Sequence, residues 1–289
     1  MPVRQRVAIV GVGLIGGSVG LALRERGLAA EVVGVGRRPA SLERALARGA
    51  IDRATTNLVD GVAEADWVVV ATPVADVADA VLSAAAASPR AAITDAGSTK
   101  AAICAAVAAA RAPLDGDEPH PVRGRFIGSH PLAGDHRTGP DFARADLLVG
   151  RTVVVTPEDA TPPGLIERAQ QFWESLGATV ELLSPEEHDR ALAATSHLPH
   201  LVAAALAGAT PEEWLRLAAT GWGDATRIAA GDPGLWTQIF QQNRAGVLDA
   251  LRRFEHRLAA LSEALASDDA AALSTELQEA KRIRDALGD

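Results

Sequence analysis

One histidine in this sequence stands in a setting that suits proton transfer. His130 lies in the stretch GSHPLAGDH, residues 128–136, directly before a proline and between glycines. A proline biases the residue before it toward extended geometry, and glycines let the chain turn sharply, so such a loop aims a side chain. A neutral imidazole can take a proton from an alcohol while hydride leaves the same carbon. The stretch favours a catalytic base at His130 over an ordinary loop histidine.

A second polar candidate is Ser98, in the segment DAGSTK at residues 95–100. It follows the apolar run AAIT and precedes an alanine-rich helical run. Its hydroxyl could hydrogen-bond both an alcohol and His130, or it could simply cap the helix. The sequence contains no tyrosine, which excludes the Tyr and Lys pair that short-chain reductases use to protonate a carbonyl.

Two later segments carry groups suited to holding a small acidic molecule. SHLPH places His197 and His200 three residues apart, and no third ligand motif accompanies them, so substrate contact is favoured over a metal site. TRIAAGDPGLW carries Arg227 and Trp236. Arginine is the natural bidentate partner of a carboxylate, although a plain surface arginine is the alternative for Arg227.

A glycine-rich turn near the start of the chain predicts a dinucleotide site. In GVGLIGGS, residues 11–18, Gly11, Gly13 and Gly16 have the G-x-G-x-x-G spacing after an apolar strand. The first glycine allows the tight turn, the second lets a pyrophosphate approach, and the third lets helix and strand pack closely. Leu14 and Ile15 open the helix whose N-terminus would hold the phosphates.

The residues after the second and third long strands bear on which nicotinamide cofactor binds. The run AEVVGVG leads into Arg37 and Arg38, where an NAD site usually has an acid for the ribose diol. Two cations suit a 2′-phosphate, so NADP is favoured over NAD, unless the arginines only begin a solvated helix. Thr72 and Pro73 follow the strand DWVVV and are further cofactor contacts, because ligands bind at the carboxyl ends of parallel strands.

The elements that must position these residues fall into two parts. Up to residue 184, short valine-rich runs alternate with helical stretches, which is typical of βα units. From residue 185 onward only helical runs broken by Pro and Gly follow. The predicted fold class is α/β, with a Rossmann-type doubly wound parallel sheet at 1–184 and an all-helical domain at 185–289. The wide apolar faces of its long helices predict a homodimer.

The composition of the chain limits the classes of molecule that it could bind. The 289 residues carry a net charge of −9 and a pI near 5.3, which argues against nucleic acid or an anionic membrane and favours a small-molecule substrate. Cys104 is the one cysteine, so neither a disulfide framework nor a cysteine metal site is available. Without a cleavable leader or a long apolar span outside alanine-rich helices, the sequence predicts a cytoplasmic protein.

Five segments of this sequence, in the order in which they occur, closely resemble the prephenate and arogenate dehydrogenases of tyrosine biosynthesis. They are GVGLIGGS, DAGSTK, GSHPLAG, SHLPH and TRIAAGDPGLW. The resemblance covers nearly the whole chain. It implies oxidative decarboxylation of prephenate to 4-hydroxyphenylpyruvate, or of arogenate to tyrosine, with NAD or NADP in a homodimer of interlocking helical domains. It makes His130 the base for the ring hydroxyl and Ser98 the residue that orients both. Arg227 would bind the substrate carboxylate. His200 and Trp236 would line the side-chain end, with Trp236 reaching across from a second subunit as one arrangement.

Three departures from the family pattern qualify the resemblance. The acid that many NAD-using members carry after the second strand is replaced here by Gly36 and Arg37. This replacement leaves the choice between NAD and NADP open and favours NADP. Where some members have a glutamate behind HPLAG, this sequence has Asp135 and His136, so specificity at that point does not transfer. The chain also ends without room for an appended regulatory domain, so any feedback by tyrosine would act at the active site.

Two other interpretations stay open at this stage. One is a different two-domain dehydrogenase with a helical second half, such as the hydroxy-acid or pyrroline reductases, which the histidine motifs oppose. The other is a non-catalytic NADP-binding sensor whose helical half only dimerises. Activity with prephenate separates both from the favoured assignment.

Overall fold

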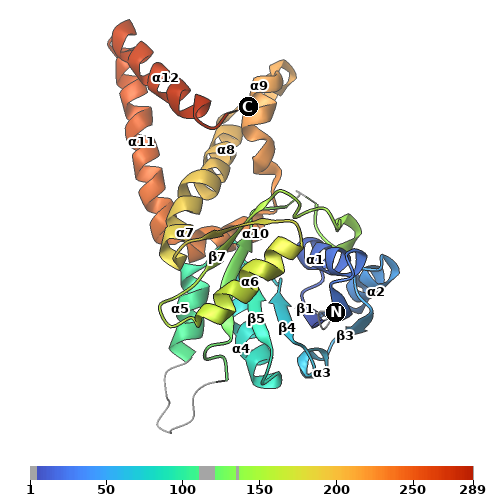
Figure 1. Cartoon of the computed structure of the whole chain (residues 1–289). Helices are drawn as coiled ribbons and strands as arrows, with labels where there is room; N and C mark the ends of the chain where they lie inside the picture. The colour runs from blue at the N-terminus through green and yellow to red at the C-terminus, as the bar shows by residue number, and fades with distance from the viewer. Residues whose placement is uncertain (1–4, 111–120, 135–136, 289) are drawn as a thin grey trace.

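The computed structural model describes residues 5–110, 121–134 and 137–288. Its centre is one eight-stranded sheet of order β3-β2-β1-β4-β5-β6-β7-β8 (Figure 1). The strands are β1 Gln5–Val10, β2 Ala29–Val35, β3 Arg53–Thr55, β4 Trp67–Val70, β5 Ala92–Asp95, β6 Phe126–Pro131, β7 Thr152–Thr156 and β8 Thr179–Leu182. The predicted Rossmann-type sheet is confirmed. It departs from a fully parallel sheet at one place, because β6 and β7 pair antiparallel.

Helices cover both faces of this sheet, as a doubly wound fold requires. They are α1 Leu14–Glu25, α2 Pro39–Ala47, α3 Leu58–Val62, α4 Val77–Ala87, α5 Ala101–Ala110 and α6 Pro163–Ser175. Alternate residues of a strand point to opposite faces. Accordingly Val7 and Ile9 of β1 join the core under α1 and α6, whereas Ala8 and Val10 join the core under α4 and α5.

After β8 the described chain is helical, as predicted. Its helices are α7 Pro185–Leu192, α8 Leu198–Ala209, α9 Thr220–Thr226, α10 Pro233–Gln242, α11 Arg244–Ala266 and α12 Ala270–Asp285. Ser184 starts the first of them through a capping box with Glu187. A single π turn, Ala193–His197, links α7 to α8.

The helical half docks on the sheet through α7 and α10. Gln242 at the end of α10 donates to the carbonyl of Val74 at 3.1 Å and accepts from the Thr99 hydroxyl at 2.6 Å. Ile239 of α10 is buried in the core cluster of the sheet face that α4 and α5 cover. The helical half is thereby held at the end of the sheet where β4 and β5 finish.

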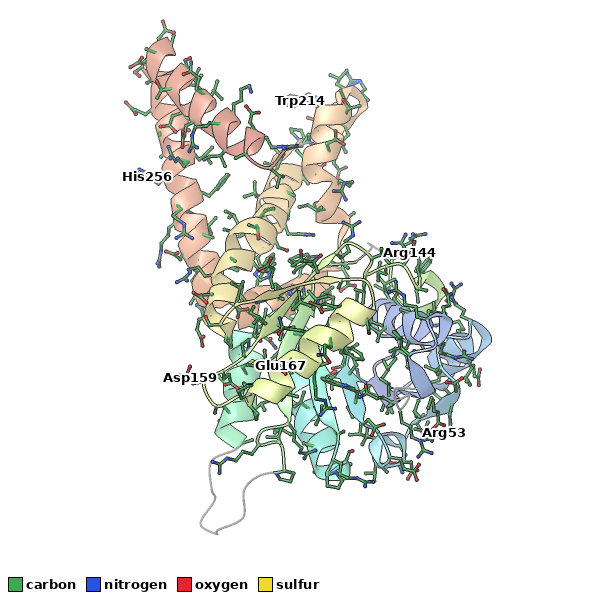
Figure 2. All side chains as sticks on the ribbon, viewed as in Figure 1. Arg53, Arg144, Asp159, Glu167, Trp214 and His256 are labelled. Carbon is green, nitrogen blue, oxygen red and sulfur yellow. The ribbon has the colours of Figure 1, made fainter. Side chains whose placement is uncertain are left out.

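Two helical arms extend away from this docking region, one built from α8 and α9 and the other from α11 and α12 (Figure 1). Leucines stand out of both arms, with Leu206 of α8 42% and Leu258 of α11 51% exposed. Figure 2 shows Trp214 at the tip of the first arm, where it is 58% exposed. The run Pro185–Ala209 has the length and apolar composition of a helix that could cross a membrane, and 22% of its most apolar stretch is buried. Core helices of soluble proteins can have the same length and composition.

Candidate active site

The predicted site residues of the sheet domain gather along one edge of the sheet. β1, β2, β4, β5 and β6 run parallel through successive pairings, so their carboxyl ends meet there. The glycine turn follows β1, Arg37 follows β2, Thr72 follows β4, Ser98 follows β5, and His130 stands near the end of β6. Ligands of open α/β sheets bind at this edge.

The glycine turn has the geometry of a phosphate cradle. Gly11 has a φ of +97°, and a Cβ there would lie 2.5 Å from the Ala71 carbonyl oxygen. A Cβ on Gly16 would lie 2.1 Å from the Gly11 oxygen. At Gly13 an added Cβ meets nothing within 4 Å. Gly11 and Gly16 therefore close the turn, while the backbone at Gly13 faces open space at the start of α1, where a pyrophosphate would bind.

Polar groups flank this cradle. The Arg37 guanidinium lies 3.2 Å from the Asp76 carboxylate, on a side chain that is 82% exposed. Arg38 stands at the N-terminal cap position of α2, so one of the two arginines does begin a helix. Among the described residues the buried Thr72 hydroxyl has no hydrogen-bond partner, and the neighbouring Pro73 is exposed. These groups suit a cofactor with ribose and carboxamide groups.

His130 is half-buried and makes a hydrogen bond that the sequence analysis did not anticipate. Its Nδ1 lies 2.9 Å from Nε2 of His188 on α7. Burial lowers the pKa of His130 well below its usual 6.5, and the charges of His188, Lys100 and His197 lower it further. At neutral pH the ring is therefore unprotonated at one nitrogen, which is the state a general base needs.

His188 and its neighbour Asp189 were both missed by the sequence analysis. His188 is fully buried and Asp189 is 5% exposed, and Nδ1 of His188 lies 2.8 Å from the Asp189 carboxylate. The signal was present, since Pro185, His188, Asp189 and Leu192 recur at helical spacing and form the buried face of α7. Two ionisable residues on the buried face of a helix are unusual enough to mark a site.

A buried ion pair fixes the segment that carries Ser98 against β6. The Lys100 ammonium pairs with the Asp95 carboxylate and also donates to the Ser129 carbonyl at 2.8 Å. Asp95 in turn accepts from the Ser129 N–H at 3.0 Å. Both partners are fully buried. The peptide immediately before His130 is therefore held in place.

The structure excludes the capping alternative for Ser98. Helix α5 begins at Ala101, and the Asp189 carboxylate accepts the N–H groups of Lys100 and Ala101 at 2.7 and 3.0 Å. Ser98 lies ahead of this turn and is half-buried. Its hydroxyl makes no hydrogen bond to another described residue, so it can serve a ligand.

The predicted substrate residues of the helical half form a second cluster. The His200 ring stacks on Trp236 with centroids 3.4 Å apart, so Trp236 contacts its own chain in this structure. Burial and the positive charge of Arg227 lower the pKa of His200, which places the exposed Arg227 nearby. His197 is 1% exposed. It lies 3.1 Å from the Asn243 side chain, and its ring centroid lies 6.3 Å from that of Trp236.

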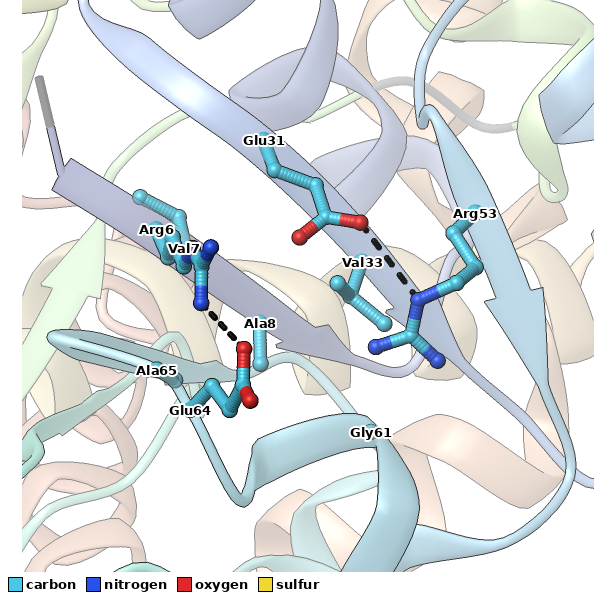
Figure 3. A pocket seen from close by; sticks show the side chains of 9 residues that line it. All are labelled: Arg6, Val7, Ala8, Glu31, Val33, Arg53, Gly61, Glu64 and Ala65. Atoms are coloured by element: carbon cyan, nitrogen blue, oxygen red, sulfur yellow. Dashed lines mark hydrogen bonds and ion pairs between the residues drawn. The ribbon is translucent and has the colours of Figure 1, made fainter.

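The hollow shown in Figure 3 is separate from these residues. It is lined by Arg6, Val7, Glu31, Arg53 and Glu64, among others, and is bordered by the starts of β1 and β3. Its open space is about 10 Å³, roughly what one water molecule needs. Asp135 and His136 lie outside the described residues.

Comparison with known proteins shows which family the chain belongs to. Residues 19–182 match the family model described as prephenate dehydrogenase, nucleotide-binding domain, and residues 184–279 match prephenate dehydrogenase, dimerization domain. Cyclohexadienyl dehydrogenase of Zymomonas mobilis is 34% identical, over 99% of this chain and 97% of its own length.

Solved structures give the same result. Prephenate dehydrogenase from Aquifex aeolicus, in complex with hydroxyphenyl propionate and NAD+, superposes with a TM-score of 0.88 at 31% identity and covers 98% of both chains. Arogenate dehydrogenase from Synechocystis has a TM-score of 0.81 at 30% identity, over 98% of this chain and 99% of its own. The chain therefore belongs to the prephenate dehydrogenase family of oxidoreductases.

Proposed function

We propose that this protein oxidises prephenate to 4-hydroxyphenylpyruvate with loss of CO2, using a nicotinamide cofactor. The observation that carries the proposal is the position of His130 at the same sheet edge as the open glycine turn, where burial lowers its pKa and so favours a neutral imidazole at neutral pH. Arogenate, which gives tyrosine, is the alternative substrate, because the two molecules differ only in a keto or ammonium group. The arogenate dehydrogenase of Synechocystis, at 30% identity, keeps this alternative open.

His130 accepts the proton of the ring hydroxyl through Nε2, since its Nδ1 is occupied by His188. The bound nicotinamide supplies the acceptor for the hydride that leaves the ring carbon bearing this hydroxyl. The bond from the ring to its carboxylate then breaks, CO2 departs, the electron pair of that bond completes the aromatic ring, and the ring oxygen takes back the proton held by His130. Ser98 orients the hydroxyl, and Arg227 binds the substrate carboxylate while the stacked His200 and Trp236 line the pocket.

NADP is the cofactor we favour over NAD. Arg37 stands at the end of β2, where the adenosine ribose of a dinucleotide lies, and its exposed guanidinium suits a 2′-phosphate. The ion pair between Arg37 and Asp76 weakens this preference for NADP, because a 2′-phosphate must displace the Asp76 carboxylate from the Arg37 guanidinium. The Aquifex relative was solved with NAD+, so both cofactors belong in the test.

We also propose that the protein works as a cytoplasmic homodimer on a small-molecule substrate, without membrane or nucleic acid as a partner. The matched dimerization model and the exposed leucines of both arms support the dimer. On this view the apolar run Pro185–Ala209 packs against a second copy of the chain and does not span a membrane.

The test is a two-by-two comparison of prephenate and arogenate with NAD and NADP, following reduced nicotinamide. We expect the highest kcat/KM with prephenate and NADP. Arg37→Ala should then raise the KM for NADP roughly tenfold or more, the equivalent of one charged hydrogen bond, and leave that for NAD within about twofold. No turnover with either substrate would refute the proposed function, and equal losses for both cofactors would refute the role of Arg37.

A further inference from the structure

A continuous chain of hydrogen bonds runs behind His130, away from the side on which substrate binds. Nδ1 of His130 lies 2.9 Å from Nε2 of His188, and Nδ1 of His188 lies 2.8 Å from the Asp189 carboxylate. The chain joins β6 to α7 across 58 residues of sequence. His188 has no exposed surface, and both of its ring nitrogens face a partner.

The acceptor at one end of this chain dictates the proton positions along it. A carboxylate only accepts hydrogen bonds, so Nδ1 of a neutral His188 must carry the proton that faces Asp189. Its Nε2 is then an acceptor. Nδ1 of His130 must in turn be the donor, which leaves the lone pair of the His130 ring on Nε2.

Asp189 is itself held rigidly enough to impose this order. Its two carboxylate oxygens accept the N–H groups of Lys100 and Ala101 at the start of α5. Its backbone carbonyl accepts from the Asn243 side chain at 2.6 Å. The backbone groups that contact the carboxylate are donors, so the carboxylate stays an acceptor toward His188.

We propose that His188, oriented by Asp189, is a positioning residue that keeps the neutral His130 ring protonated at Nδ1 and its Nε2 free to accept the substrate proton. The inference rests on the proposed role of His130 as base. Without His188 the ring of His130 can rotate or change tautomer, and a ring protonated at Nε2 cannot accept the hydroxyl proton.

The first test reads the tautomer directly in the substrate-free protein. Long-range ¹H–¹⁵N spectra of the histidine-labelled enzyme near pH 7.5 should show His130 protonated at Nδ1 and unprotonated at Nε2, with His130→Asn identifying its signals. His188→Ala should lose this fixed pattern, and His188→Gln should keep it, because the glutamine amide oxygen can accept from Nδ1. A His130 ring protonated at Nε2 in the wild type, or an unchanged pattern in His188→Ala, would overturn the proposal.

The second test is kinetic and separates positioning from folding. His188→Ala should lower kcat about 100-fold or more and change the KM for prephenate less than about threefold, and His188→Gln should recover most of the lost kcat. Thr156→Val is the matched control. It removes a buried polar side chain from β7 of the sheet domain, outside the chain of hydrogen bonds behind His130, so it should lower the melting temperature without changing kcat.

If His188→Gln is as impaired as His188→Ala while both remain folded, the positioning role is refuted. The spectra stay informative even when no substrate is turned over. A wild-type protein that shows the expected His130 tautomer but oxidises neither substrate would refute the proposed function alone.

Discussion

At the scale of single residues, the chemistry depends on how His130 is kept neutral. Burial and three basic neighbours, His188, Lys100 and His197, all lower its pKa. A lower pKa makes the ring a weaker proton acceptor but keeps it unprotonated at neutral pH. Because aromatisation of the product makes the overall reaction strongly favourable, a weak but correctly placed base is sufficient.

Arg227 should act on binding more than on the chemical step. If its guanidinium holds the substrate carboxylate, Arg227→Ala should raise the KM for prephenate roughly 10- to 100-fold, with kcat falling much less. The same change should raise the pKa of His200, since the charge of Arg227 contributes to lowering it. Steady-state kinetics and an NMR titration of His200 measure the two effects.

Arg216→Ala is a suitable control for Arg227→Ala. Arg216 is exposed in the segment before α9 and donates to the carbonyl of Glu213, so its loss should leave KM unchanged. A defect in kcat alone for Arg227→Ala would contradict the carboxylate assignment.

At this scale the sequence was informative only where a local pattern constrains a residue. The spacing of Gly11, Gly13 and Gly16 predicted a glycine turn between strand and helix. The proline after His130 predicted the extended backbone that this histidine has in β6. The hydrogen bond between His130 and His188 could not be predicted, because it joins residues 58 apart whose proximity depends on how α7 docks. The capping role assigned as the alternative for Ser98 belongs to Asp189, which lies 88 residues from the N–H of Ala101.

At the scale of elements, the junction of α7 and α8 combines a π turn with a buried histidine. His197 ends this turn, is 1% exposed, and lies 3.1 Å from the Asn243 side chain. Burial lowers its pKa to about 4. π turns of this kind are often found at functional sites.

His197 should make the stability of the protein depend on acid pH. Its pKa is lower in the folded state than in the unfolded state, so between pH 6.5 and 4 the unfolded chain binds more protons. The free energy of unfolding should therefore be highest above pH 6.5 and fall as the pH drops toward 4, by about 3 kcal/mol from this group. His130 acts in the same direction.

Urea unfolding of the wild type and His197→Gln at pH 7 and pH 4.5 measures this dependence. The variant should lose less stability on acidification than the wild type. His256→Gln changes an exposed histidine on α11 (Figure 2) and should keep the wild-type dependence. The same pH dependence in all three proteins would show that His197 is not the group responsible.

Hydrophobic pattern predicted the order of the strands and helices because the central strands are buried on both faces and the helices that cover the sheet are buried on one. It did not predict that β7 runs antiparallel to β6. A run such as RTVVVT has the same composition in either direction, and its direction is set by the path of the long connection before it. The π turn likewise leaves no pattern of its own in the sequence.

At the scale of the whole molecule, the two arms leave more apolar surface exposed than a single chain of this kind should tolerate. Leu265 of α11 and Ile283 of α12 are 66% and 58% exposed, in addition to Leu206 and Leu258. A second copy packed between the arms would cover such a surface. The sequence predicted this feature from helix length and apolar content, but not the separation of the arms.

The native mass should therefore be twice the chain mass of 29.9 kDa. Light scattering should report this dimer for the wild type, and Leu206→Glu combined with Leu258→Glu should shift the mass toward one chain, because buried carboxylates oppose association. Leu46→Glu, at an exposed leucine of α2, should leave the dimer intact. A wild-type protein of single-chain mass would contradict the proposed dimer.

The most direct test of the account is the rate of prephenate oxidation by His130→Asn compared with the wild type. In the wild type kcat/KM should be level through neutral pH and fall only at a pH well below 6.5, because burial lowers the pKa of His130 well below that usual value. The variant should lose turnover by about 100-fold or more and retain its affinity for the nicotinamide cofactor. A variant that turns over prephenate at close to the wild-type rate would contradict the role of His130 as the base.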